Sequence, residues 1–132
     1  MNKTDAMDLF TDERLDKIFP ADKADIFFEA LYGDASEGAY DISLRFSKIE
    51  ANKLIFEFHL KQRPGKCLAC NLTFGLPTVF SRHPVINLDR VKDEINTLLN
   101  GKALCTEWEV KPTVEVNRSL HLLPVIFSIV KQ

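Results

Sequence analysis

Two cysteines three positions apart, in Cys67-Leu-Ala-Cys70, form the only familiar pattern of reactive residues in the chain. Zinc knuckles and thiol redox sites use this spacing. His83 and Cys105 could complete a set of four metal ligands with Cys67 and Cys70. The chain has no second Cys-x-x-Cys and no His-x-His pair. We therefore expect structural thiols and no bound cofactor, with the metal site kept as an alternative.

The residues around these cysteines alternate between apolar and polar, which predicts a strand over 67–75. Positions three apart in a regular strand point to opposite faces, so Cys70 is expected in the core and Cys67 near the polar side. A thiol redox role also needs a feature that lowers the thiol pKa, usually a helix N-terminus. No such helix is predicted beside Cys67.

A second group of candidates lies on the polar face of the predicted sheet. Its members are Arg45, Glu57, His59 and Asn71. A concave face with these groups could bind an anionic or polar small molecule, or host proton transfer. The alternative is a solvated face with ion pairs, which antiparallel sheets commonly show. His121 would join the polar side only if the last strand keeps its phase.

Arg82 and His83 lie in Ser81-Arg82-His83-Pro84, within a long connecting segment. Functional residues are enriched on such segments, so the pair is a candidate recognition surface. The same two residues could instead tether the connector to neighbouring helices. The chain contains no glycine-rich phosphate loop, Gly-x-Ser-x-Gly or His-Glu-x-x-His motif, so an enzyme is not favoured.

Composition predicts a single domain over 1–132, since 132 residues with 45% hydrophobic and 27% charged side chains are typical of one compact domain. Residues 1–37 hold ten acids and four bases, whereas 38–132 hold nine acids and thirteen bases. The pI of about 5.9 argues against a nucleic-acid partner. No apolar run approaches the roughly 20 residues that span a bilayer, and the first residues are too charged for a signal peptide. We expect a cytoplasmic protein without a membrane partner.

The first 37 residues predict two helices, over 12–19 with Thr11 as N-cap and over 22–32 with Gly33 at its end. Alternation then predicts strands over 40–47 and 54–61. Their even-numbered residues are apolar, so the pair requires an odd loop, assigned to Glu50-Ala51-Asn52 with Asn52 left-handed. This register places Phe46 opposite Phe56, Leu44 opposite Phe58 and Arg45 opposite Glu57. The strand over 67–75 completes a three-stranded meander, joined to the second strand by a turn at Arg63-Pro64-Gly65-Lys66.

The remaining chain predicts an ordered crossover over 75–87, a helix over 88–100 capped by Asn87, and a hairpin of 104–116 with 120–130. Pro112 is expected level with Pro124, which suggests a kink or bulge there. Trp108 is expected to point inward, toward Phe127. The run 125–130 is almost continuously apolar, as in strands covered on both faces, so we expect the N-terminal helices or a second subunit to cover it.

These elements define an α+β domain of order α-α-β-β-β-α-β-β, with helices on one face of an antiparallel sheet. Over about 12–130, this order after an acidic helical start resembles type III secretion chaperones. The predicted function is a small non-enzymatic interaction module, chaperone- or adaptor-like, whose partner is another protein or a second copy of itself. The alternatives are a small-molecule binder or enzyme on the polar sheet face, and a metal site at the Cys-x-x-Cys.

Overall fold

The computed structural model describes residues 2–33, 40–65 and 76–131. Its helices are α1 (Lys3–Leu9), α2 (Asp12–Ile18), α3 (Lys23–Tyr32), α5 (Leu76–Arg82) and α6 (Leu88–Leu99). Its strands are β1 (Tyr40–Glu50), β2 (Lys53–Gln62), β3 (Ala103–Val110), β4 (Val114–Asn117) and β5 (Leu120–Lys131). None of these helices combines the length and hydropathy needed to cross a bilayer.

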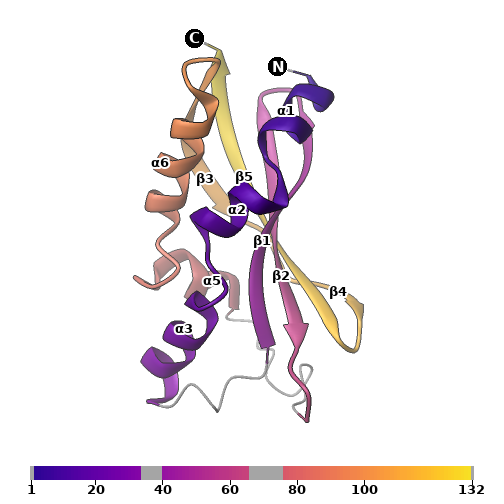
Figure 1. Cartoon of the computed structure of the whole chain (residues 1–132), viewed down its shortest axis with the longest axis vertical. Helices are drawn as coiled ribbons and strands as arrows, with labels where there is room; N and C mark the ends of the chain where they lie inside the picture. The colour runs from indigo at the N-terminus through magenta and orange to yellow at the C-terminus, as the bar shows by residue number, and fades with distance from the viewer. Residues whose placement is uncertain (1, 34–39, 66–75, 132) are drawn as a thin grey trace.

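The described strands form one antiparallel sheet in the order β1-β2-β5-β3, with β4 also paired to β5. The helices lie on one side of this sheet, with α2 crossing in front of the strands and α6 beside β3 and β5 (Figure 1). The predicted α+β class is therefore confirmed. β5 is the central strand, since it pairs with β2 along one edge and with β3 and β4 along the other.

Alternation along each strand places the core between the sheet and the helices. On β2, Leu54, Phe56, Phe58 and Leu60 are fully buried. Leu123, Val125, Phe127 and Ile129 of β5 join them. The helical side contributes further rings, and Phe19, the residue that ends α2, meets the ring of Phe58 edge to face at 5.1 Å. Burying one such phenylalanine stabilises the fold by about 1.5–3 kcal/mol.

The first hairpin has the predicted register, with Phe46 opposite Phe56 and Arg45 opposite Glu57. Its turn is shorter than predicted, however. Glu50 pairs with Lys53, so the loop has two residues, and Ala51 rather than Asn52 takes the positive φ of 50°. The odd offset comes from a bulge at Ser47, between Phe46 and Lys48. One extra residue in β1 restores the same parity that a three-residue loop would have provided.

The predicted three-stranded meander is wrong in one respect that β2 itself shows. β2 pairs with β1 on one edge and with β5 on the other, from Lys53 to Lys61. A third consecutive strand therefore cannot pair with β2 along this length. The predicted strand 67–75 and its cysteines lie outside the described residues. Local alternation identified β2 correctly but could not identify its second neighbour, whose paired residues lie 59 to 75 positions later.

The last hairpin is broken where the two prolines were expected to disturb it. The segment predicted as one strand over 104–116 is two strands, β3 and β4, separated at 111–113. The amide of Lys111 still donates to the carbonyl of Pro124 at 2.9 Å across this break. Trp108 lies opposite Phe127 and packs partly against the core, as predicted. Its indole Nε1 also donates to Asp89 of α6 at 2.8 Å.

Two short helices, α1 and α5, were not predicted. α1 begins with a reciprocal capping box, in which the Asn2 side chain accepts from the Asp5 amide and the Asp5 carboxylate accepts from the Asn2 amide. Phe10, which ends this helix, is buried against Phe46 and Phe56. The spacing Asn2-x-x-Asp5 was the available signal for α1. α5 lacks such a signal, because its seven residues include Pro77 and are too few to show a period.

Candidate functional site

The side of the sheet that faces away from the helices is called here the open face. Three strands supply most of it, and β5 runs along its middle. The open face consists of Lys53, Ile55, Glu57 and His59 of β2, Leu122, Pro124, Ile126, Ser128 and Val130 of β5, Leu104, Glu107 and Glu109 of β3, and Val114 of β4. These positions alternate with the buried residues of the same strands.

An apolar stripe runs along the middle of the open face. Leu122, Ile126 and Val130 of β5 form its centre, and Ile55 of β2 lies directly opposite Ile126. Val130 is 48% exposed and Leu104 is 42% exposed. Over the residues that the structure describes, none of these side chains belongs to the helix-covered core or packs against it. β5 is therefore apolar on both faces, as predicted, but the described helices cover only one of them.

The centre of the open face is a shallow depression of about 440 Å³. Ile126 and Ser128 of β5 form its floor, Lys53 lies on the β2 side, and Glu107 and Glu109 lie on the β3 side. Ser128 has the shortest side chain among the open-face residues of β5, which leaves room between its longer neighbours. The depression therefore has one positive wall, one negative wall and a floor formed by one apolar and one hydroxyl side chain.

Of the three charged residues that line this depression, only Glu109 has an ion-pair partner within the described chain, and Lys48 nearby is also paired. Lys48 contacts Glu50 at 2.9 Å, and Lys111 contacts Glu109 at 3.0 Å. Within the ranges that the structure describes, neither Lys53 nor Glu107 has an ion-pair partner. The two residues flank Ser128 in the same row, since Lys53 and Glu107 are both opposite it in the ladders. Their unpaired charges thus lie at opposite walls of one depression.

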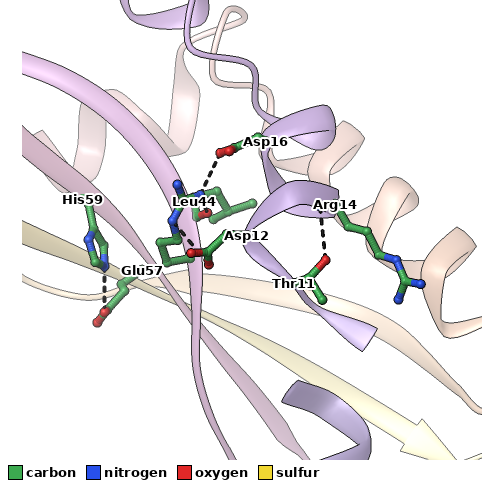
Figure 2. A network of polar contacts seen from close by, with 8 residues as sticks. Thr11, Asp12, Arg14, Asp16, Leu44, Glu57 and His59 are labelled. Atoms are coloured by element: carbon green, nitrogen blue, oxygen red, sulfur yellow. Dashed lines mark hydrogen bonds and ion pairs between the residues drawn. The ribbon is translucent and has the colours of Figure 1, made fainter. Parts of the chain in front are cut away.

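The predicted ligand-binding residues do not converge on a single pocket. The side chain of Arg45 turns to α2, where it contacts Asp16 at 2.7 Å and Asp12 at 3.4 Å. His59 Nε2 and Glu57 Oε1 lie 2.9 Å apart, on the same strand and face. Figure 2 shows Glu57 and His59 directed toward each other, while Asp12 and Asp16 approach β1 beside Leu44. Arg45 thus forms ion pairs with α2, Glu57 and His59 form a hydrogen-bond contact with each other, and Asn71 lies outside the described residues.

Arg82 and His83 lie at the end of α5, in the connector where they were predicted. Arg82 is exposed, whereas the His83 ring meets the ring of Phe27 edge to face at 4.8 Å. The Val85 amide donates to His83 Nδ1 at 3.2 Å. Burial of the ring lowers the pKa of His83 below its ordinary value of 6.5. His83 therefore anchors the turn between α5 and α6 to α3, in line with the tether alternative.

The candidate metal ligands divide between described and undescribed parts of the chain. Cys67 and Cys70 lie outside the described residues. Cys105 is buried on the helix side of β3, where burial raises the pKa of its thiol to about 12. Over 2–33, 40–65 and 76–131, no three His, Cys, Asp or Glu side chains are grouped as metal ligands would be. The metal site thus remains a prediction that depends on the two undescribed cysteines.

His121 lies on the core side of β5 and is only 3% exposed, so the polar phase considered for it does not occur. Its Nε2 is 3.8 Å from Glu115 Oε1 of β4. Neither ring nitrogen has a hydrogen-bond partner within the described chain. The ring faces away from the open face, so His121 and His59 contribute to different surfaces.

Sequence reasoning missed the residues that define the depression. Lys53 falls just before the predicted second strand. Glu107 lies opposite Ser128 because a bulge at Thr106 shifts the pairing of β3 with β5 by one residue. The continuous apolar run 125–130 was the available signal, because it indicated a second face of β5 that needs a cover. Searches against family models, curated proteins and solved structures found no match to this chain. The likeness in element order to type III secretion chaperones therefore has no matched relative to support it.

Proposed function

We propose that the chain is a small, non-enzymatic protein-interaction module that binds another protein surface through the open face. One observation carries the proposal: the central strand presents a second apolar side that no described element covers. The side chains of Ile55, Leu122 and Ile126 are half-buried, and those of Leu104 and Val130 are exposed. Contiguous apolar surface open to solvent in this way is typical of interaction sites in proteins. The partner is a second copy of the chain or another protein with a complementary apolar surface. A cytoplasmic location is part of the same proposal.

Polar-ligand binding at Arg45, Glu57 and His59 is less well supported. Arg45 is engaged by two carboxylates of α2, and Glu57 and His59 contact each other. A polar ligand would have to replace these contacts, so part of its binding energy would be lost in breaking them. The geometry therefore favours the apolar stripe over the polar candidates as the binding surface.

The proposal is tested by Ile126→Asp, with Ile26→Asp as a matched control. Ile26 is a 45% exposed isoleucine on α3, remote from the open face. We expect Ile126→Asp to abolish concentration-dependent self-association measured by light scattering, or, if the protein is a monomer, to abolish binding of a hydrophobic dye. Ile26→Asp should leave both unchanged. A wild-type monomer whose dye binding is absent, or is the same in both variants, would contradict the proposal.

A further inference from the structure

We propose that two copies of the chain pair through their open faces around a two-fold axis parallel to β5. This inference rests on the proposed function and specifies the partner and the geometry. Homodimers with such an axis use the same surface on both subunits, so the surface must be complementary to itself. The open face meets this condition in its charge, because Lys53 and Glu107 lie on opposite sides of β5 at one level.

This axis lies between the two sheets. A half-turn about it places the β2 side of one copy over the β3 side of the other, and each residue keeps its level along β5. β5 of one copy then crosses β5 of the other, and β2 of each copy lies over β3 of its partner. Two sheets packed face to face in this way commonly cross at about 30° and lie about 10 Å apart. Residues in one row of the sheet therefore face the mirrored row of the partner.

The row through Ser128 is the one whose charges become complementary. Lys53, Ser128 and Glu107 follow one another across β2, β5 and β3. After the two-fold rotation, Lys53 lies over the partner's Glu107, and Glu107 lies over the partner's Lys53. The depression at Ser128 provides the space into which the partner's lysine can extend. Two equivalent ion pairs thus flank the axis.

Lys53 and Glu107 are also the residues in this row that need a partner. In the part of the chain that the structure describes, their charges are unpaired, whereas Lys48 and Glu109 have ion-pair partners and Glu57 has a hydrogen-bond contact with His59. A charge buried without a partner is destabilising, so an interface over this row must pair both residues. Lys61 is exposed at the far end of β2, where its charge can stay in water.

The extent of the open face fits a small homodimer interface. With the axis on β5, the overlapping area is three strands wide (β2, β5 and the edge formed by β3 and β4), which is about 14 Å at about 4.8 Å spacing, and the 12 residues of β5 extend about 40 Å. The overlapping area is therefore about 580 Å² in projection, near the roughly 600 Å² per partner at the lower end of standard interfaces. Ile126, next to the axis, would meet the partner's Ile126 at the centre of this area.

A second axis, running across the strands through Ile126, is the main competitor. It would place Lys53 over the partner's Glu57 and Glu107 over the partner's Lys111. Glu57 already contacts His59 at 2.9 Å, and Lys111 already contacts Glu109 at 3.0 Å. The crosswise axis thus asks two paired side chains to serve a second partner. The axis parallel to β5 uses the two unpaired ones.

Charge exchange distinguishes the two axes. The variants are Lys53→Glu, Glu107→Lys, the double variant Lys53→Glu with Glu107→Lys, and the control Lys53→Glu with Glu57→Lys. Dimer dissociation constants are measured by sedimentation equilibrium, with thermal unfolding to show that each variant is folded. Each single reversal should weaken the dimer roughly 10- to 100-fold, because like charges then face each other. The Lys53/Glu107 exchange should restore affinity to within a few-fold of wild type, and the Lys53/Glu57 exchange should not.

Failure of this geometry differs from failure of the proposed function. If Ile126→Asp dissociates the dimer but only the Lys53/Glu57 exchange restores it, or neither exchange does, the axis parallel to β5 is wrong and the open face remains the binding surface. A wild-type monomer at all concentrations overturns the homodimer. Dye binding that Ile126→Asp removes would then assign the open face to another protein or to the chain's own residues 66–75.

Discussion

Neighbouring side chains on β5 differ sharply in their surroundings, although most of them are apolar. Phe127 is fully buried and contacts the ring of Phe56, whereas Ile126 and Ser128 beside it lie on the open face. Alternation along the strand predicts this division correctly for the odd-numbered residues of the core. It does not predict which side the helices cover, because both sides of the strand are apolar. Residue types alone therefore predicted that both faces of β5 are apolar, but not which of the two the helices leave uncovered.

Cys105 provides a test of burial at the scale of one atom. Its thiol, with a pKa raised to about 12 by burial, stays protonated at neutral pH and does not attack disulfide reagents. We expect Cys105, in a variant with Cys67→Ser and Cys70→Ser, to react with such a reagent only after addition of denaturant. The absorbance of the released thiolate reports the reaction. A full equivalent released within minutes from the folded protein would contradict this placement.

His83 makes stability depend on pH in a defined direction. Burial lowers its pKa in the folded state below the ordinary value of 6.5, so the unfolded chain binds more protons in this range. The stabilisation from the neutral ring is therefore complete above about pH 6.5 and is lost as pH falls through the lowered pKa. Denaturant unfolding at several pH values between about 7.5 and 5.5 should show a steeper loss for wild type than for His83→Phe. Equal slopes would exclude this role of His83.

At the scale of elements, the sequence predicted those whose pattern is long and regular. The helix over 88–100 appears as α6, Leu88–Leu99, with the Asn87 side chain accepting from the Arg90 amide at 3.3 Å. The first hairpin has the predicted pairs. The bulges at Ser47 and Thr106 could not be predicted, since each depends on how distant strands align. The pairing of β2 with β5 could not be predicted for the same reason, since the two strands are distant in sequence.

One side chain secures α6 to the bulge in β3. Asn96 Oδ1 accepts from the Cys105 amide at 2.7 Å, and Asn96 Nδ2 donates to the Cys105 carbonyl at 3.2 Å. Asn96→Ala leaves both backbone groups without these bonds, so we expect a loss of about 1–3 kcal/mol in the free energy of unfolding. The neighbouring Thr97→Ala, on the exposed side of α6, should cost less than about 0.5 kcal/mol. Equal effects in urea unfolding would contradict the bridging role of Asn96.

At the scale of the whole molecule, the sheet has one face under helices and one face open. The sequence predicted this layered arrangement and predicted that a second subunit or helices would cover β5. The candidate site itself was not predicted, because Lys53, Ser128 and Glu107 come together only through the pairing of three strands distant in sequence. Arg45, Glu57 and His59 lie on one side of the ladder formed by β1 and β2, yet they contact one another or α2.

The central claim, that the open face is a binding surface between copies, is tested most directly by labelling a cysteine in its centre. The variant carries Ser128→Cys together with Cys67→Ser and Cys70→Ser. Its rate of modification by a thiol reagent is measured in separate samples at protein concentrations from about 1 to about 500 μM. Ile26→Cys in the same combination is the control. We predict that the labelling rate at position 128 falls several-fold as the concentration rises, while the rate at position 26 stays constant. A rate at position 128 that is independent of concentration would contradict the account.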